Sequence, residues 1–177
     1  MNQIRFLLVA AIVLVALVIF KESTPVPVKE PNVLELPPLR SPVNRTDPPC
    51  LQMYYYIEKY ADSFNIPKRF AYGIASHETG YKGPFHWQYN PALSSSANAV
   101  GPMQIMQSTA RYINHENVSL SKLRNDIGYN IMTSMKLLRK LHNLYGDWQT
   151  TFGAYNCGYP CINGYAVQVY NHQINWK

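Results

Sequence analysis

Apolar and polar positions divide the chain into three stretches. Residues 6–20 form an unbroken apolar run, and residues 21–49 hold eight of the thirteen prolines with almost no helical periodicity. From Cys50 onward, apolar residues recur at the three- and four-residue spacing of amphipathic helices. We therefore predict a signal anchor or transmembrane segment at 1–21, a Pro-rich linker at 22–49 and a folded domain at 50–177.

The apolar run from Phe6 to Phe20 lies between Arg5 and Lys21. As a helix it would be roughly 22 Å long, which is shorter than a hydrocarbon core of ~30 Å, although the flanking Arg and Lys side chains can extend toward the interface. A cleaved signal peptide is the alternative, but the run ends in Val-Ile-Phe without the small residues that cleavage needs. We favour an uncleaved anchor, followed by a linker that its prolines keep extended as a semi-rigid spacer.

The folded part is predicted to be mainly α, as a single compact domain. Asp126 is expected to cap a long helix that ends at Gly146, and Asp147 is expected to cap the next helix. No run of alternating residues is long enough to predict a sheet. The helices are expected at 50–64, 67–78, 103–114, 127–145, 148–155 and 165–174.

Charge and cysteine content narrow the classes of partner and cofactor. The formal net charge of +6 suits an anionic partner such as a cell-wall polymer, a membrane surface or nucleic acid. No Lys/Arg-rich run or nucleic-acid-binding signature is present, so we do not expect a nucleic-acid partner. Cys50, Cys157 and Cys161 lack the spacing of a zinc site, and we expect no metal and no cofactor. In an exported domain they allow one disulfide and one free thiol, in a pairing that the sequence leaves open.

Acidic residues are few after the linker, and one of them differs from the rest. Five have a structural interpretation as exposed or helix-capping residues: Glu58, Asp62, Glu116, Asp126 and Asp147. Glu78 instead ends an apolar helical segment beside a glycine. Because burial disfavours the charged form, a carboxyl group in this setting keeps its proton near neutral pH and can act as a general acid.

Several strings of residues are informative in combination. They are HETGY at His77–Tyr81, YNPALSSSANAVGPMQ at Tyr89–Gln104, the Asp and Asn-Ile of Asp126–Ile131, GDW at Gly146–Trp148 and AYNCG at Ala154–Gly158. In this order they resemble the motifs of soluble lytic transglycosylase (SLT) domains, the goose-lysozyme-like branch of the lysozyme superfamily. Those motifs are Glu-Ser-x-Phe, Phe-x-Pro-x-Ala-x-Ser-x-x-Gly-Ala-x-Gly-Leu-Met-Gln, Asp-Pro-x-x-Asn-Ile, Gly-x-Trp and Ala-Tyr-Asn-x-Gly.

The chain departs from this pattern at a few positions. Thr79 replaces the Ser of the family motif, Asn98 a Gly, Pro102 a Leu and Gln107 the usual Pro. Extra residues at Lys82–Gln88, close to Glu78, separate the first two motifs. We expect this insertion to reshape the rim of the substrate cleft and to leave the acid itself in place.

The resemblance implies a lysozyme-like fold in which Glu78 is the catalytic residue. By matching position it also implies five substrate-binding residues: Ser95, Met103, Gln104, Tyr155 and Asn156. Each has a structural alternative: Met103 also suits a core position and Asn156 a turn, and a shift of one residue in the match would put Ser94 or Ser96 in the place of Ser95. No metal is required by this chemistry.

The implied activity is that of a peptidoglycan lytic transglycosylase, which cleaves the MurNAc–GlcNAc bond and leaves a 1,6-anhydro product. A muramidase and a non-catalytic glycan-binding domain are the alternatives. The expected location is the inner membrane, with a single span and the catalytic domain in the periplasm, or else secretion or a virion. The expected partners are peptidoglycan strands, the membrane, and a cell-envelope-spanning assembly or a virion.

Overall fold

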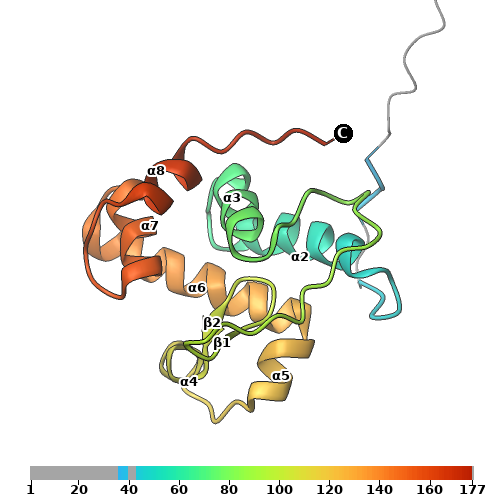
Figure 1. Cartoon of the computed structure of the whole chain (residues 1–177), viewed down its shortest axis with the longest axis horizontal. Coiled ribbons are helices and arrows are strands. Elements are labelled where there is room, and N and C mark those ends of the chain that lie inside the picture. Colours follow the sequence, from blue (N-terminus) through green and yellow to red (C-terminus); the bar gives the residue numbers. More distant parts are fainter. Residues whose placement is uncertain (1–35, 40–42, 177) are drawn as a thin grey trace, which may run out of the picture. The chain divides into compact units, whose positions relative to one another are not determined.

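The computed structural model describes residues 36–39 and 43–176, and within them the protein is mainly helical (Figure 1). Its seven helices in that part of the chain are accompanied by one two-stranded sheet. In chain order the elements are α2 (Pro49–Ser63), α3 (Lys68–Thr79), β1 (Ala99–Val100), β2 (Ile105–Met106), α4 (Gln107–Asn114), α5 (Leu120–Asn125), α6 (Ile127–Tyr145), α7 (Trp148–Cys157) and α8 (Gly164–Tyr170).

The predicted membrane anchor lies outside the described residues, as does most of the predicted linker. Among the residues that are described, no helix combines the length and the apolar character needed to cross a bilayer. Helix α2, the first within the described residues, begins at Pro49, one residue before the predicted start of the domain. The division into anchor, linker and domain therefore stays a prediction.

Helix α6 is the central element of the core. It packs against α2, α4, α5, α7 and β2, and Figure 1 shows it running between the α2–α3 pair and the β1–β2 hairpin. Its inward stripe of Ile131, Met135 and Leu138 is fully buried, as its apolar spacing predicts. Leu144, near the C-terminal end of the same helix, is 69% exposed.

The predicted helix caps are confirmed. The carboxylate of Asp126 accepts a hydrogen bond from the backbone N–H of Tyr129 at 3.0 Å, and that of Asp147 accepts one from Thr150 at 2.8 Å. Gly146 follows α6 in the left-handed conformation that a side chain disfavours. These contacts are local in sequence, which is why the pattern alone was sufficient to predict them.

The helix predicted from Met103 is wrong in its first part. Residues 99–106 instead form an antiparallel hairpin, with Ala99 opposite Met106 and Val100 opposite Ile105. Gly101 and Gln104 both have positive φ angles, which a right-handed helix does not permit. A Cβ on Gly101 would also lie 2.5 Å from the side-chain nitrogen of Asn130, so this turn has no room for a side chain. Helix α4 consequently begins only at Gln107.

Two further differences concern short elements. Helix α5 was not predicted, because six residues are too few for a clear periodicity. Helix α8 ends at Tyr170 rather than at Ile174.

Glu58 does not lie on a solvated helix face, as the sequence suggested. Its side chain is 13% exposed and accepts hydrogen bonds from Lys68 at 2.6 Å and from the hydroxyl of Tyr72 at 2.7 Å. Because the Tyr72 ring is buried, its hydroxyl needs an acceptor inside the protein, and Glu58 supplies it. These bonds join α2 to α3 and orient the helix that carries Glu78.

The cysteines form one disulfide, between Cys157 and Cys161, and Cys50 is a buried free thiol. The disulfide closes the loop between α7 and α8. A Cβ on Gly153 of α7 would lie 1.7 Å from the carbonyl oxygen of Cys161, so this loop packs directly against the helix backbone.

Candidate active site

Glu78 is the penultimate residue of α3, and its carboxyl group is half-buried. Gly80 ends the helix in a left-handed conformation and turns the chain away from the carboxyl group. Burial raises the pKa of Glu78, and a hydrogen bond from the hydroxyl of Tyr165 partly opposes this increase. A Glu with a raised pKa retains its proton at a higher pH than a free side chain, as a general acid requires.

Tyr165 is the residue in direct contact with Glu78 that sequence reasoning missed. Its hydroxyl donates a 2.7 Å hydrogen bond to Oε1 of Glu78 across 87 positions of sequence. It is the second residue of α8, whose N-cap Asn163 accepts a hydrogen bond from the N–H of Ala166 at 2.9 Å. The Asn cap predicts where α8 begins, but nothing in the local pattern indicates the carboxylate that the tyrosine meets.

Thr79, next to Glu78, joins the end of α3 to the hairpin. Its hydroxyl lies 2.6 Å from the hydroxyl of Tyr89 and has two carbonyl acceptors within reach, Pro102 at 3.0 Å and Ala75 at 3.2 Å. Since the single proton of Thr79 is directed to these carbonyls, Tyr89 is the donor in the first bond. Thr79 thus retains the hydroxyl group of the Ser that it replaces in the family motif. The hydroxyl of Tyr89 holds this group in place by a hydrogen bond.

Tyr155 lies on α7 and holds the backbone of Met103. Its hydroxyl donates to the Met103 carbonyl at 2.6 Å and is 2.9 Å from the hydroxyl of Ser134. Burial and the nearby charge of Glu78 both raise the pKa of Tyr155, so it remains a protonated donor beside the carboxyl group. A direct catalytic role for Tyr155 would require a hydrogen bond to Glu78. Among the described residues, the Tyr155 hydroxyl makes no such bond.

Met103 contributes its backbone to this arrangement. Its side chain is 0% exposed, which favours the core position over the cleft wall that the sequence also allowed. Its N–H donates to Oδ1 of Asn130 at 3.0 Å, and the Nδ2 of Asn130 donates to the carbonyls of Val100 and Leu123, each at 2.9 Å. One buried Asn on α6 therefore positions the whole 100–103 turn.

Three of the predicted substrate-binding residues line one cavity. Gln104, Tyr155 and Asn156 surround a hollow of about 290 Å³, whose apolar wall includes Leu137 and Leu141. The side chain of Gln104 donates to the carbonyl of Gly101 at 2.9 Å, and that of Asn156 accepts from Asn163 at 2.9 Å. Glu78 is not among the residues that line this cavity.

Ser95 has a different environment. It is exposed, and its hydroxyl accepts a hydrogen bond from the N–H of Ala99 at 3.1 Å. This bond tightens the 95–98 turn, in which Asn98 has a φ of 61°, the left-handed conformation that Gly favours. In the described part of the chain no hydrogen bond joins Ser95 to Glu78.

The insertion at Lys82–Gln88 is held by the C-terminal segment. Gly83 lies so close to the indole of Trp176 that a Cβ would be 2.3 Å from it. Trp176 also meets the ring of Tyr72 edge-on at 4.9 Å. Trp87 of the same insertion is 61% exposed.

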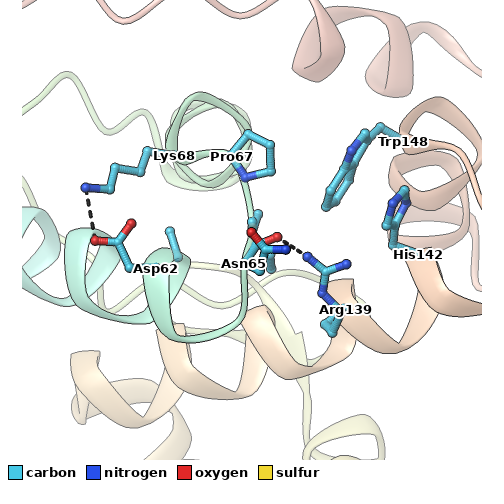
Figure 2. A pocket seen from close by; sticks show the side chains of 9 residues that line it. Asp62, Asn65, Pro67, Lys68, Arg139, His142 and Trp148 are labelled. Carbon is cyan, nitrogen blue, oxygen red and sulfur yellow. Dashed lines mark hydrogen bonds and ion pairs between the residues drawn. The ribbon is translucent and has the colours of Figure 1, made fainter.

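A second hollow, shown in Figure 2, lies at the turn between α2 and α3, at the other end of α3 from Glu78. Its charged groups already have partners within the protein. Lys68 is paired with Glu58 and Asp62, and Arg139 donates to the carbonyls of Phe64 and Asn65. His142 and Trp148 stack at 3.9 Å. These contacts stabilise the turn between α2 and α3. Glu78 is not among the residues that line this hollow.

The described residues contain no group of three His, Cys, Asp or Glu side chains arranged to hold an ion.

Comparisons with known proteins agree on one family. The family model described as "Transglycosylase SLT domain" matches residues 55–176. Membrane-bound lytic murein transglycosylase D of Escherichia coli (strain K12) is 31% identical over 71 residues, which are 40% of this chain and 16% of that protein. The match thus spans less than a fifth of that relative's length.

Two solved structures are similar in fold. They are the 70-kDa soluble lytic transglycosylase from Escherichia coli and a complex of the 70-kDa soluble lytic transglycosylase with bulgecin A. Each is 24% identical, covers 65% of this chain and 18% of the other, and has a TM-score of 0.51.

Proposed function

The chain belongs to the transglycosylase SLT domain family, and from this premise we propose that it is a peptidoglycan lytic transglycosylase. The predicted mainly α, lysozyme-like fold is confirmed for the described domain. The proposed reaction cleaves the β-1,4 bond between N-acetylmuramic acid and N-acetylglucosamine and forms a 1,6-anhydro-muramoyl end. The single observation that carries it is the half-buried Glu78, whose pKa is raised by burial and whose carboxyl group accepts a hydrogen bond from Tyr165.

The environments of the other acidic residues support a mechanism with one carboxyl group. Glycosidases that use water need a second carboxylate on the opposite side of the scissile bond or close to the first. Five other acidic side chains of the domain are bonded to partners away from Glu78: Glu58, Asp62, Glu116, Asp126 and Asp147. Glu78 is therefore proposed to act twice.

In the first step Glu78 is the acid. Its proton passes to the glycosidic oxygen, the bond from that oxygen to C1 of the muramoyl residue breaks, and the N-acetylglucosamine end leaves with a hydroxyl group. Positive charge develops at C1, and the newly formed carboxylate of Glu78 faces it. The Tyr165 hydroxyl stabilises this carboxylate, because a hydrogen bond to the charged form favours it.

In the second step the same carboxylate is the base. It takes the proton from the C6 hydroxyl of the muramoyl residue while O6 forms a bond to C1. Glu78 is again protonated, and no water enters the product. Exclusion of water from the site then determines the outcome, since water at the same place would give the hydrolytic product of a muramidase.

The five predicted binding residues are proposed to hold the glycan around this centre. Gln104, Tyr155 and Asn156 line one cavity. Ser95 belongs to the 95–98 turn, and Met103 to the turn of the hairpin. The carbonyl and N–H of Met103 are bonded to Tyr155 and Asn130 and its side chain is buried, so we propose that Met103 acts by fixing the turn that precedes Gln104.

Mass spectrometry of the soluble products from purified sacculi tests the reaction. We expect muropeptides that are lighter by one water than the reducing-end products of a muramidase. Reducing ends without anhydro sugar would support the muramidase and exclude the transglycosylase. Binding to sacculi without any released product would instead support a non-catalytic glycan-binding domain.

The cellular setting is a separate proposal, supported by the sequence of residues 1–49. We propose an inner-membrane anchor that holds the domain in the periplasm on an extended linker, for local opening of the wall during secretion, conjugation, pilus assembly or phage entry. N-terminal sequencing of the membrane fraction tests the anchor. An N-terminus beyond residue 21 would exclude it and support secretion.

A further inference from the structure

One side chain, that of Asn163, joins the helix that carries Tyr165 to the end of α7. Its Oδ1 accepts a hydrogen bond from the backbone N–H of Ala166 at 2.9 Å, which caps α8. Its Nδ2 donates to Oδ1 of Asn156 at 2.9 Å and to Sγ of Cys157 at 3.3 Å. Because a backbone N–H can only donate, only this orientation of the amide satisfies all three contacts.

Helix α8 depends on this cap more than a longer helix would. It has only seven residues, and the first four backbone N–H groups of any helix lack a partner within it. Tyr165 is the second residue of α8, so its backbone belongs to the turn that the cap fixes. Loss of the cap would therefore loosen the turn from which Tyr165 reaches Glu78.

The second half of α8 is held by α3 without any contribution from Asn163. Helix α8 lies beside both α7 and α3 (Figure 1). A Cβ on Gly73 of α3 would lie 3.2 Å from the carbonyl oxygen of Val169, so the two helix backbones are in close contact. Arg69 donates to the carbonyl of Tyr170 at 2.6 Å. A change at Asn163 should thus affect the first turn of α8 and leave its packing on α3 in place.

The donor group of Asn163 acts on the wall of the proposed glycan cavity. Asn156 lines that cavity together with Gln104 and Tyr155. The bond from Asn163 fixes the Asn156 amide by its oxygen, which leaves the amide nitrogen to donate to a sugar hydroxyl or to the acetamido oxygen of an N-acetyl sugar. The Cys157–Cys161 disulfide ties the end of α7, where this bond is made, to the loop before Asn163.

We propose that Asn163 is a positioning residue that places both Tyr165 and Asn156, and so couples the support of the acid to the binding of the glycan. The inference rests on the proposed function, which assigns the acid to Glu78 and the glycan to the cavity. The oxygen of Asn163 acts on the chemical step through Tyr165, and its nitrogen acts on binding through Asn156. Because the two roles use different atoms, substitution can separate them.

Two variants and the titration of Glu78 test the role of the oxygen. Asn163→Ser keeps an oxygen that can cap α8, whereas Asn163→Ala removes it. The full chain, labelled with 13C at Glu, is titrated by NMR, and the signal that is absent in Glu78→Gln identifies this carboxyl group. Since the bond from Tyr165 lowers the pKa of Glu78, we expect a higher pKa in Asn163→Ala and a native one in Asn163→Ser.

A double variant shows whether the effect passes through Tyr165. In the background of Tyr165→Phe, Asn163→Ala should raise the pKa of Glu78 no further. A second rise of equal size, or a native pKa in Asn163→Ala alone, would overturn the proposal. This titration needs no enzymatic activity, so its result is independent of whether the chain releases anhydro products. Asn163→Gly, which costs less at a cap position, carries the same test if Asn163→Ala fails to fold.

Kinetics on soluble peptidoglycan strands test the role of the nitrogen. Both Asn163→Ser and Asn163→Ala lose the donor to Asn156, so KM should rise roughly threefold in each, as in Asn156→Ala. The kcat should fall roughly fivefold in Asn163→Ala and stay close to native in Asn163→Ser. Gln168→Ala, at an exposed position of α8, is the control and should change neither constant. A native KM in Asn163→Ser would exclude the coupling to Asn156.

Discussion

The hydroxyl of Tyr165 donates a 2.7 Å hydrogen bond to the carboxyl group of Glu78, and this bond joins the last helix to the catalytic candidate on α3. Two effects on the pKa of Glu78 oppose each other. Burial favours the neutral acid, while the tyrosine favours the carboxylate. A group that must give a proton and then take one back needs both forms to be accessible, and this pairing supplies that balance.

The first prediction concerns Tyr165→Phe. Removal of the donor takes away the contribution that lowers the pKa of Glu78, so that pKa rises further. The alkaline limb of kcat/KM, where the acid loses its proton, should move to higher pH, and kcat should fall roughly tenfold or more. A pH–rate profile measures both. Tyr170→Phe on the same helix is the control, and an alkaline limb that stays in place or moves downward would contradict the assignment.

The second prediction concerns Glu78→Gln and stability. A Glu whose folded pKa is raised stabilises the fold fully below its unfolded pKa, and this contribution is lost as pH rises through the folded pKa. The variant cannot ionise, so it should unfold at a higher temperature than the native chain at pH 7, with a smaller difference at acidic pH. Its activity should fall by about a thousandfold. Thermal unfolding at several pH values tests the sign, which a variant less stable at pH 7 would refute.

The third prediction concerns Asn130, which makes three buried hydrogen bonds to the hairpin turn and to α5. Asn130→Ala leaves one N–H and two carbonyls without their partner and should lower the free energy of unfolding by about 3 kcal/mol. Urea denaturation measures this loss. Asn143→Ala, at an exposed position of the same helix, should change it by about 0.5 kcal/mol or less. Equal losses in the two variants would show that the turn is held in another way.

The fourth prediction concerns the disulfide. Without a reductant the unfolded chain should expose one thiol, that of Cys50, and with a reductant it should expose three. Replacing Cys157 and Cys161 by Ser should cost about 2 kcal/mol of stability, because the closed loop is short. Activity should fall as well, since Cys157 contacts Asn163, the cap of the helix that carries Tyr165. Three thiols in the unreduced chain would contradict the pairing.

Prediction from the sequence was best where the determining contacts are local. The Asp126 and Asp147 caps, the Gly146 stop and the inward stripe of α6 each depend on residues three or four positions apart. The prediction failed at Met103–Met106, where apolar spacing resembled a helix but the positive φ angles of Gly101 and Gln104 required a hairpin. It failed at Glu58 for a related reason, since the residues that bury this acid lie on another helix.

The same distinction between local and tertiary contacts applies to the candidate site. The order of motifs in the sequence was sufficient to select Glu78 as the catalytic candidate and to place the chain in its family. Both inferences depend only on residue types and their spacing, which can be read directly from the sequence. The bond from Tyr165, the use of Tyr155 to hold Met103 and the pairing of Cys157 with Cys161 depended on the tertiary structure. Each is a contact that depends on how the helices pack, and packing brings together side chains whose separation along the chain carries no signal of their approach.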